Sequence, residues 1–227
     1  MKRKEAIRSA YRLTGGNNFY DGMITCSTLS GKAVCRLVWA MNKVECDDYL
    51  EKALSGIPED FSGKLLEVPV GTGILTIPVY QTMPEADITC LDYSADMMGQ
   101  AQEKADHLHL KNVTFRQGDV GALPFTDGVF DIVLSLNGFH AFPDKEAAYR
   151  EVFRVLRPGG TFCGCFYVAG ELRRTDWFVR HVYEKTGFFT PPYETVFSLK
   201  NRLERMYAAV TLENVKGIAW FICRKAG

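Results

Sequence analysis

Apolar runs alternate with amphipathic stretches through the middle of the chain. A short apolar run bounded by turn residues predicts a buried strand, and apolar residues at a spacing of three and four predict a helix. The predicted strands are residues 65–68, 86–91, 113–117, 130–136 and 161–168, and the predicted helices between them are 74–80, 94–107 and 147–156. This alternation is typical of an α/β domain built on a parallel sheet.

The two ends of the chain depart from this alternation. Residues 33–54 carry apolar positions at roughly helical spacing and predict one amphipathic helix that leads into the core. Residues 169–206 mix arginines with aromatic residues, and Gly187 and a pair of prolines interrupt them. Residues 208–215 and 217–224 predict two strands joined by a short turn.

A glycine turn follows the first predicted strand. Glu67 stands near the end of that strand, and the turn reads Pro69-Val-Gly71-Thr72-Gly73. Glycine lets the backbone approach a ligand where a Cβ would collide, and such a turn aims N–H groups and a helix N-terminus at the ligand. The turn therefore predicts a nucleotide-like cofactor, with an ordinary strand-to-helix turn as the alternative.

Two cofactor classes use such a turn, and its spacing separates them. The dinucleotide fingerprint is G-x-G-x-x-G, but Thr76 occupies the place of the third glycine after Gly71 and Gly73. The second pattern is E-x-G-x-G-x-G, which this chain matches from Glu67 to Gly73 except that Pro69 replaces the first glycine. In this feature the sequence resembles the class I S-adenosylmethionine (SAM)-dependent methyltransferases.

Three later segments extend the resemblance. Residues 92–97, DYSADM, are similar to the D-x-S-x-x-M string of that family, and residues 118–125, GDVGALPF, are similar to its G-D-x-x-x-L-P-F string. Residues 151–160, EVFRVLRPGG, match E-x-x-R-V-L-x-P-G-G, which marks the family by a helix stop and carries no chemistry. The resemblance implies a Rossmann-like three-layer sandwich, whose seven-stranded, mostly parallel sheet ends in an antiparallel closing strand.

The stretch before the core resembles a narrower branch. Residues 19–39 are similar to the N-terminal Y-D-x-M-N…S…G…R-x-x-W region of the quinone-biosynthesis C-methyltransferases, although Ile24 replaces the asparagine and Cys35 replaces a histidine. In such enzymes this region folds over the cofactor, so Tyr20 and Met23 are candidate lid residues. Packing of an N-terminal helix against the domain is the alternative. Because the spacing also differs, the substrate of that branch does not carry over.

The residue patterns and the resemblance together predict a division of the chain into parts. These parts are a helical N-terminal lid or extension at 1–60, a SAM-binding core at 61–168, an inserted substrate cap at 169–206 and a closing β-hairpin at 207–227.

The resemblance assigns parts of the cofactor to named residues. The acid and the glycine turn would hold the methionine end of SAM, the end of the second strand its ribose, and the ends of the third and fourth strands its adenine and remaining contacts. The candidate cofactor residues are Glu67, Pro69, Gly71, Thr72, Gly73, Asp92, Tyr93, Met97, Asp119, Val120 and Asn137, together with Tyr20 and Met23. Asp92 ends its strand 19 positions after Gly73, where a ribose-binding acid is also needed for NAD. A turn or cap is the structural alternative for Asp119, and core packing is the alternative for Met97.

Methyl transfer from a sulfonium is an in-line displacement that depends mainly on positioning in a dry site, so no metal is obligatory. Seven cysteines without a CxxC pair agree with the absence of a metal site. An oxygen or activated carbon acceptor can still need a base. His140, which follows the fourth predicted strand, is the candidate because its ordinary pKa suits neutral pH. A purely structural histidine is the alternative.

The composition of the chain argues against some classes of binding partner. Lysine plus arginine and aspartate plus glutamate number 27 each, so no overall field attracts nucleic acid or a membrane surface. No stretch approaches the roughly 18 apolar residues that span a bilayer. We predict a cytoplasmic methyltransferase, without membrane insertion, that acts on a small molecule and releases S-adenosylhomocysteine. An NAD-type oxidoreductase and a non-catalytic SAM-binding protein stay open as alternatives.

Overall fold

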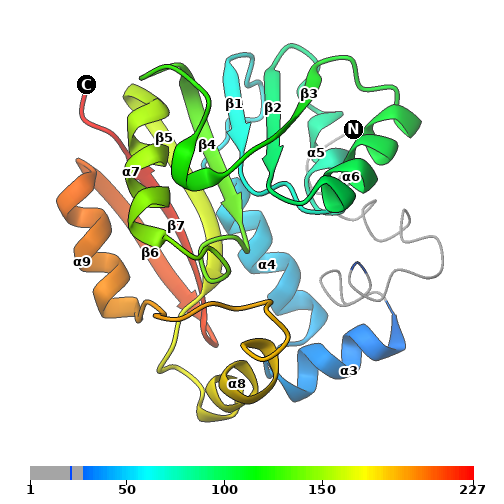
Figure 1. Cartoon of the computed structure of the whole chain (residues 1–227), viewed down its shortest axis with the longest axis vertical. Helices are drawn as coiled ribbons and strands as arrows, with labels where there is room; N and C mark the ends of the chain where they lie inside the picture. Colours follow the sequence, from blue (N-terminus) through cyan, green and yellow to red (C-terminus); the bar gives the residue numbers. More distant parts are fainter. Residues whose placement is uncertain (1–20, 22–27) are drawn as a thin grey trace.

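A computed structural model describes residue 21 and residues 28–227 (Figure 1). One seven-stranded sheet has the order β3-β2-β1-β4-β5-β7-β6. Its strands are β1 (Lys64–Glu67), β2 (Asp87–Asp92), β3 (Val113–Gln117), β4 (Phe130–Leu136), β5 (Leu156–Tyr167), β6 (Ala209–Val215) and β7 (Ile218–Arg224). The strands from β3 to β5 pair in parallel, and β7 lies antiparallel between β5 and β6. The predicted α/β class and the mostly parallel seven-stranded sheet are therefore confirmed.

The central strands are apolar on both faces because helices cover both sides of the sheet. Successive residues of β1 illustrate this, since Leu65 belongs to one buried cluster and Leu66 to the other. The first cluster includes residues of α4 (Lys43–Leu54), α5 (Ile77–Tyr80) and α6 (Ala95–His107). The second includes residues of α7 (Lys145–Val155) and α9 (Val196–Met206). These two layers with the sheet between them form the predicted three-layer sandwich.

The prediction of one helix over residues 33–54 is wrong, because two helices occupy this stretch. The first is α3 (Leu29–Leu37), and the second is α4. Ala40 lies between them with a left-handed φ of +55°. Asn42 then starts α4 with a capping box, in which its side chain accepts from the Glu45 N–H at 3.0 Å and the Glu45 carboxylate accepts from the Asn42 N–H at 2.9 Å.

The helix predicted at 74–80 is shorter than expected. It begins only at Ile77, so that Pro78 lies within its first turn. Proline lacks an N–H and is tolerated at the start of a helix, where that N–H would have no intrahelical partner. The glycine turn is therefore followed by one turn of helix and not by a long helix whose N-terminus faces a ligand.

The segment between β5 and β6 contains α8 (Arg173–Phe178), a π-helical stretch η2 (Val179–Tyr183) and α9. A short 3₁₀ helix, η1 (Val120–Ala122), follows β3. Within the described part of the chain, no helix is both long and apolar enough to cross a bilayer. The division into lid, core, cap and hairpin stays a prediction.

Candidate functional site

The predicted cofactor residues gather at one edge of the sheet. Parallel strands β3, β2, β1 and β4 end at this edge, and the chain direction across the sheet reverses between β1 and β4. In open α/β sheets a ligand lies in the crevice that such a reversal leaves at the carboxyl ends of the strands. Glu67 ends β1 and Asp92 ends β2, while Asn137 directly follows β4. The strand order thus brings the predicted residues of these strands to neighbouring positions.

The glycine turn has the backbone conformation that its glycines predict. Gly71 and Gly73 have φ values of +56° and +65°, which a residue with a Cβ rarely adopts. A Cβ on Gly73 would lie 2.5 Å from Ile77 Cγ1 and 2.9 Å from Ala101 Cβ, whereas among the described residues a Cβ on Gly71 would meet only Met97 Cε, at 3.6 Å. Gly73 therefore lets α6 pack closely, and Gly71 leaves the turn open toward Met97.

Pro69 does not prevent this turn. The Val68–Pro69 peptide bond is cis, and the proline ring lies against Gly138. A Cβ on Gly138 would come within 2.3 Å of Pro69 Cδ and 2.8 Å of Phe142 Cζ. The glycine after β4 thus makes room for the ring that replaces a glycine of the family pattern.

Glu67 is a buried acid with only 1% of its surface exposed. The Tyr80 hydroxyl donates to its carboxyl at 2.6 Å, and the Cys90 thiol lies 3.7 Å from the same oxygen. Burial raises the pKa of Glu67 to about 8, although these hydrogen bonds partly oppose the rise. The site therefore holds a carboxyl group that is ready to ionise when a cation approaches it.

Asp92 organises the turn from the next strand. Its carboxylate accepts from the Gly71 N–H at 2.7 Å and from the Ser94 N–H at 2.9 Å. Burial raises its pKa, and these backbone bonds oppose the rise. Ser94 in turn accepts from the Met97 N–H at 3.3 Å and caps α6, whereas Tyr93 is 78% exposed. The Asp92 carboxylate has further lone pairs that ribose hydroxyls could use.

The segment after β3 has the geometry of a helix cap. Asp119 is exposed and accepts from the Gly121 N–H at 2.7 Å, and Val120 is buried at the start of η1. This bond occupies one carboxylate oxygen of Asp119 and holds the turn. The predicted contact of Asp119 and Val120 with adenine stays a prediction, as does that of Asn137.

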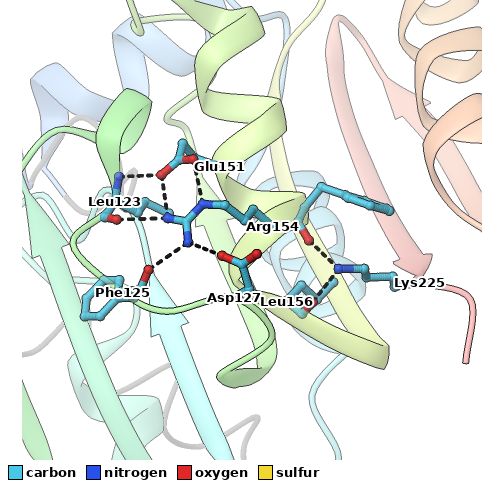
Figure 2. A network of polar contacts seen from close by, with 8 residues as sticks. Leu123, Phe125, Asp127, Glu151, Arg154, Leu156 and Lys225 are labelled. Atoms are coloured by element: carbon cyan, nitrogen blue, oxygen red, sulfur yellow. Dashed lines mark hydrogen bonds and ion pairs between the residues drawn. The ribbon is translucent and has the colours of Figure 1, made fainter.

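The E-x-x-R string of residues 151–154 clamps this segment to α7 (Figure 2). The Leu123 N–H donates to Glu151 at 2.8 Å, and Arg154 donates to the carbonyl groups of Leu123 and Phe125 at 3.0 and 2.8 Å. Arg154 also pairs with Asp127 at 2.7 Å. The family marker thus has a structural task beyond ending α7, because it positions the chain that follows Asp119.

His140 lies in the turn after β4, within a layer of aromatic rings. Only 8% of its surface is exposed, and its ring stacks on Phe189 with a centroid separation of 4.0 Å. Its Nδ1 accepts from the Tyr167 N–H at 3.3 Å, which places a hydrogen on Nε2 in this arrangement. Burial lowers the pKa of His140 to about 3, so the ring is neutral at neutral pH.

The same layer forms an aromatic cluster that the sequence did not place. Trp39 stacks on Tyr183 at 6.3 Å, Tyr183 stacks on Phe189 at 5.1 Å, and Tyr167 meets Trp39 edge-on at 5.9 Å. We call these four residues and His140 the aromatic cluster. They come from four separate places in the chain: the residues after α3, the ends of β4 and β5, and the segment between β5 and β6. The mixture of charge and aromatics in 169–206 is the sequence signal for part of this cluster.

Asp21 is a site residue that the sequence pattern did not identify, although it belongs to the Tyr-Asp pair of the N-terminal region. Its side chain is 4% exposed and accepts from the Thr72 hydroxyl at 2.5 Å. Its second oxygen lies 3.3 Å from the ammonium of Lys104 in α6. Asp21 therefore ties the chain before the core to the middle of the glycine turn. The neighbouring lid candidates Tyr20 and Met23 lie outside the described residues.

We expect Asp21→Asn to lower the free energy of unfolding by about 2 kcal/mol, because the largely buried Lys104 ammonium loses its counter-charge. Urea denaturation measures this change. Asp60→Asn, at an exposed position, is the matched control and should change stability by less than about 0.5 kcal/mol. Equal stability of the Asp21 variant and the wild type would show that this contact does not hold the turn.

Comparisons with known proteins decide between the two cofactor classes. Residues 65–160 match a family described as a methyltransferase domain. This stretch is a methyltransferase domain. The match covers the glycine turn, Asp92, Asp119 and the clamp of Glu151 and Arg154, so the predicted family and its SAM cofactor class are confirmed. The NAD-type alternative is not favoured.

Relatives with quinone-related names share this methyltransferase domain. The demethylmenaquinone methyltransferase of Thermus thermophilus is 39% identical over 97 residues, which are 43% of this chain and 44% of that protein. The 2-methyl-6-phytyl-1,4-hydroquinone methyltransferase 2 of Oryza sativa is 35% identical over 136 residues, which are 59% of this chain and 36% of that protein. The chain thus spans about two fifths of the length of these curated relatives.

The fold of the methyltransferase domain recurs in solved structures. Phosphoethanolamine N-methyltransferase 2 of Haemonchus contortus, solved with S-adenosyl-L-methionine, aligns with a TM-score of 0.67 at 15% identity. The alignment covers 94% of this chain and 61% of that one. At this identity the likeness supports the Rossmann-like architecture alone.

Proposed function

We propose that this protein is a SAM-dependent methyltransferase that methylates a small molecule with a flat aromatic ring. The observation that carries the cofactor part is the pair of buried acids, Glu67 and Asp92, at neighbouring strand ends on either side of an open glycine turn. The aromatic cluster at the ends of β4 and β5 carries the acceptor part. Names of the relatives add support for the acceptor class.

The residues of the turn fit the methionine end of SAM. Glu67 would pair with the ammonium group, and the gain in Coulomb energy would release the proton that burial keeps on this carboxyl. Gly71 would let the backbone approach the ligand, because a Cβ there would meet, among the described residues, only Met97 Cε. Asp92 would accept from the ribose hydroxyls while it keeps the Gly71 N–H in place. The adenine would lie between Asp119 and Val120 on one side and Asn137 on the other.

SAM supplies an activated methyl group, which the acceptor takes as the carbon–sulfur bond breaks and its electron pair stays on sulfur. The protein would contribute by holding the acceptor in line with that bond and by excluding water. Rings of the aromatic cluster suit this task because stacked and edge-on contacts orient a flat acceptor without charge. Quinols and other phenols have this shape and carry an electron-rich ring carbon or oxygen.

Two measurements test this function. Calorimetric titration with S-adenosylhomocysteine and NAD tests the cofactor, and binding of NAD alone would overturn the proposal. Transfer of a radiolabelled methyl group, screened over quinols, phenols, carboxylic acids and amines, tests the acceptor. We expect label in the quinols or phenols. Cofactor binding without transfer to any of these classes would leave a non-catalytic SAM-binding protein as the better description.

The prediction that His140 is the general base has its own test. Its neutral, buried ring fits packing on Phe189 better than proton transfer, so we expect His140→Phe to keep methyl transfer within about threefold at saturating substrates. The variant should lose about 1 kcal/mol of stability, because the Tyr167 N–H loses its acceptor. A loss of about 100-fold in kcat, together with an acidic limb in the wild-type pH profile that the variant lacks, would instead assign the base role to His140.

A further inference from the structure

Two neighbouring segments expose an unusual set of charges. The first is α3, and the second is residues 173–188, which include α8 and η2. The exposed charged side chains of these segments are all cations: Lys32, Arg36, Arg173, Arg174, Arg180 and Lys185. Although the chain as a whole has no net charge, these six positions concentrate positive charge on one part of its surface.

The acids of the same two segments are less exposed than these cations. No acid occurs within α3. Asp176 is half-buried and accepts from the Tyr167 hydroxyl at 2.6 Å and from the Gly170 N–H at 3.1 Å. Glu184 is also half-buried. The exposed charge is therefore not neutralised by acids within these segments.

Large apolar side chains lie among these cations. Leu37 of α3 is 61% exposed, Trp177 of α8 is 53% exposed and Val182 of η2 is 39% exposed. The two segments are joined directly, because Arg174 donates to the Arg36 carbonyl at 3.0 Å and Thr175 donates to the Val38 carbonyl at 2.6 Å. Figure 1 shows α3 and α8 together at one end of the molecule, beyond the sheet. We call this surface the basic face.

The basic face lies next to the aromatic cluster. Trp39 follows α3, Tyr183 ends η2, and their half-buried rings stack on each other. An amphiphilic acceptor held at a surface on this side of the protein would therefore have a short route to the cluster. Cations mixed with tryptophan and aliphatic residues on short helices are typical of segments that lie in the headgroup layer of a bilayer.

We propose that the basic face docks peripherally on an anionic lipid bilayer. The occupant follows from the combination of charge and apolar side chains: lipid phosphates would pair with the arginines and lysines, and Trp177 and Leu37 would enter the headgroup layer. A nucleic acid would use the cations and leave the apolar side chains without a partner. The proposal goes beyond the proposed function and does not depend on methyl transfer.

Co-sedimentation of the full chain with vesicles tests the proposal. We expect binding to phosphatidylcholine vesicles that contain phosphatidylglycerol, little binding to phosphatidylcholine alone, and weaker binding as salt rises. Neutralising three cations in Arg173→Gln/Arg180→Gln/Lys185→Gln should lower the partition coefficient about 100-fold, since each cation near an anionic surface contributes about fivefold. Trp177→Ala should lower it about tenfold through lost apolar burial.

Matched variants on α7 and α9 serve as controls. Arg150→Gln/Lys200→Gln/Arg205→Gln removes the same number of exposed cations, and Phe197→Ala removes a side chain that is 75% exposed. Both should bind vesicles as the wild type does, and all variants should bind S-adenosylhomocysteine equally. Equal loss in both sets of variants, absence of binding to the anionic vesicles, or tighter binding to duplex DNA than to vesicles would overturn the proposal. Concentration-dependent dimers that the Trp177 variant abolishes, without vesicle binding, would assign the face to a second copy instead.

Discussion

Replacing Glu67 with glutamine should weaken the binding of S-adenosylhomocysteine about 10- to 100-fold at pH 7. A hydrogen-bonded contact to a charged, buried partner contributes about that much, and glutamine can accept a hydrogen bond but cannot supply the charge. The expected loss is large because Glu67 is only 1% exposed, and solvent screens a contact with a buried carboxylate less than a contact at the surface. Isothermal titration of both proteins measures the change.

The same substitution should make the unliganded protein more stable at alkaline pH. The pKa of Glu67 is raised from 4.5 in an exposed glutamate to about 8. Between these pKa values the unfolded chain releases a proton that the folded protein retains. The free energy of unfolding is therefore unaffected by Glu67 below about pH 4.5, and it falls as the pH rises until the folded carboxyl ionises near pH 8. Glutamine removes this fall. We expect a gain of about 2–4 kcal/mol at pH 8 and no gain at pH 4.

Thermal unfolding from pH 4 to pH 8 measures the second effect, and Glu85→Gln is the control at an exposed position of the same type. The control should change neither affinity nor stability. Burial also raises the pKa of Asp92, so the stability of the Glu67 variant should still fall with rising pH, but with a smaller slope than in the wild type. A Glu67 variant that binds S-adenosylhomocysteine as tightly as the wild type would remove this acid from the site.

Gly73→Ala should be the most damaging change in the glycine turn. Alanine at a φ of +65° costs about 1–2 kcal/mol, and a Cβ 2.5 Å from Ile77 and 2.9 Å from Ala101 forces α6 away from the turn at a similar further cost. We expect the free energy of unfolding to fall by about 3–4 kcal/mol. Chemical denaturation at pH 7 measures it.

Two other glycines separate backbone strain from packing and from binding. Gly99 lies inside α6, and a Cβ added there would have no neighbour within 4 Å in the described part of the chain, so Gly99→Ala should stabilise the protein by about 0.5–1 kcal/mol. Gly71→Ala should cost about 1–2 kcal/mol from its φ of +56°, and it should strongly weaken S-adenosylhomocysteine binding because the Cβ points to the open side of the turn. The Gly73 variant should lose more stability than the Gly71 variant, because only Gly73 packs against α6. Equal losses in the two variants would show that this packing contact contributes nothing.

The core strands could be predicted from the sequence because each is a short apolar run between turn residues. Residues 113–117 and 130–136 match β3 and β4 at both ends. The helices near the N-terminus could not be bounded in the same way. Apolar spacing continues through residues 38–42, and only the capping box of Asn42 and Glu45 together with the left-handed Ala40 marks the break.

The candidate site also contains residues that the sequence could predict and residues that it could not. Glu67 and Asp92 each end a strand, and the two glycines lie in the turn that follows β1. A local pattern was therefore enough to find these residues, and the parallel sheet brought them together. Asp21 and the aromatic cluster depend on contacts between distant segments, such as the 51 positions between Asp21 and Thr72. No local spacing encodes such contacts. His140 shows a further limit, because its position after β4 was found while its burial, which sets its pKa, depends on Phe189 from another segment.

The residues proposed for the cofactor and those proposed for the acceptor are distributed differently along the chain. The described cofactor candidates all lie between Glu67 and Asn137. The aromatic cluster also draws on Trp39, which precedes this stretch, and on residues from Tyr167 to Phe189, which follow it. Selection can therefore alter the acceptor by changing the flanking segments while the cofactor stretch stays as it is. Sequence similarity would then survive longest in the middle of the chain, where the match at residues 65–160 is found.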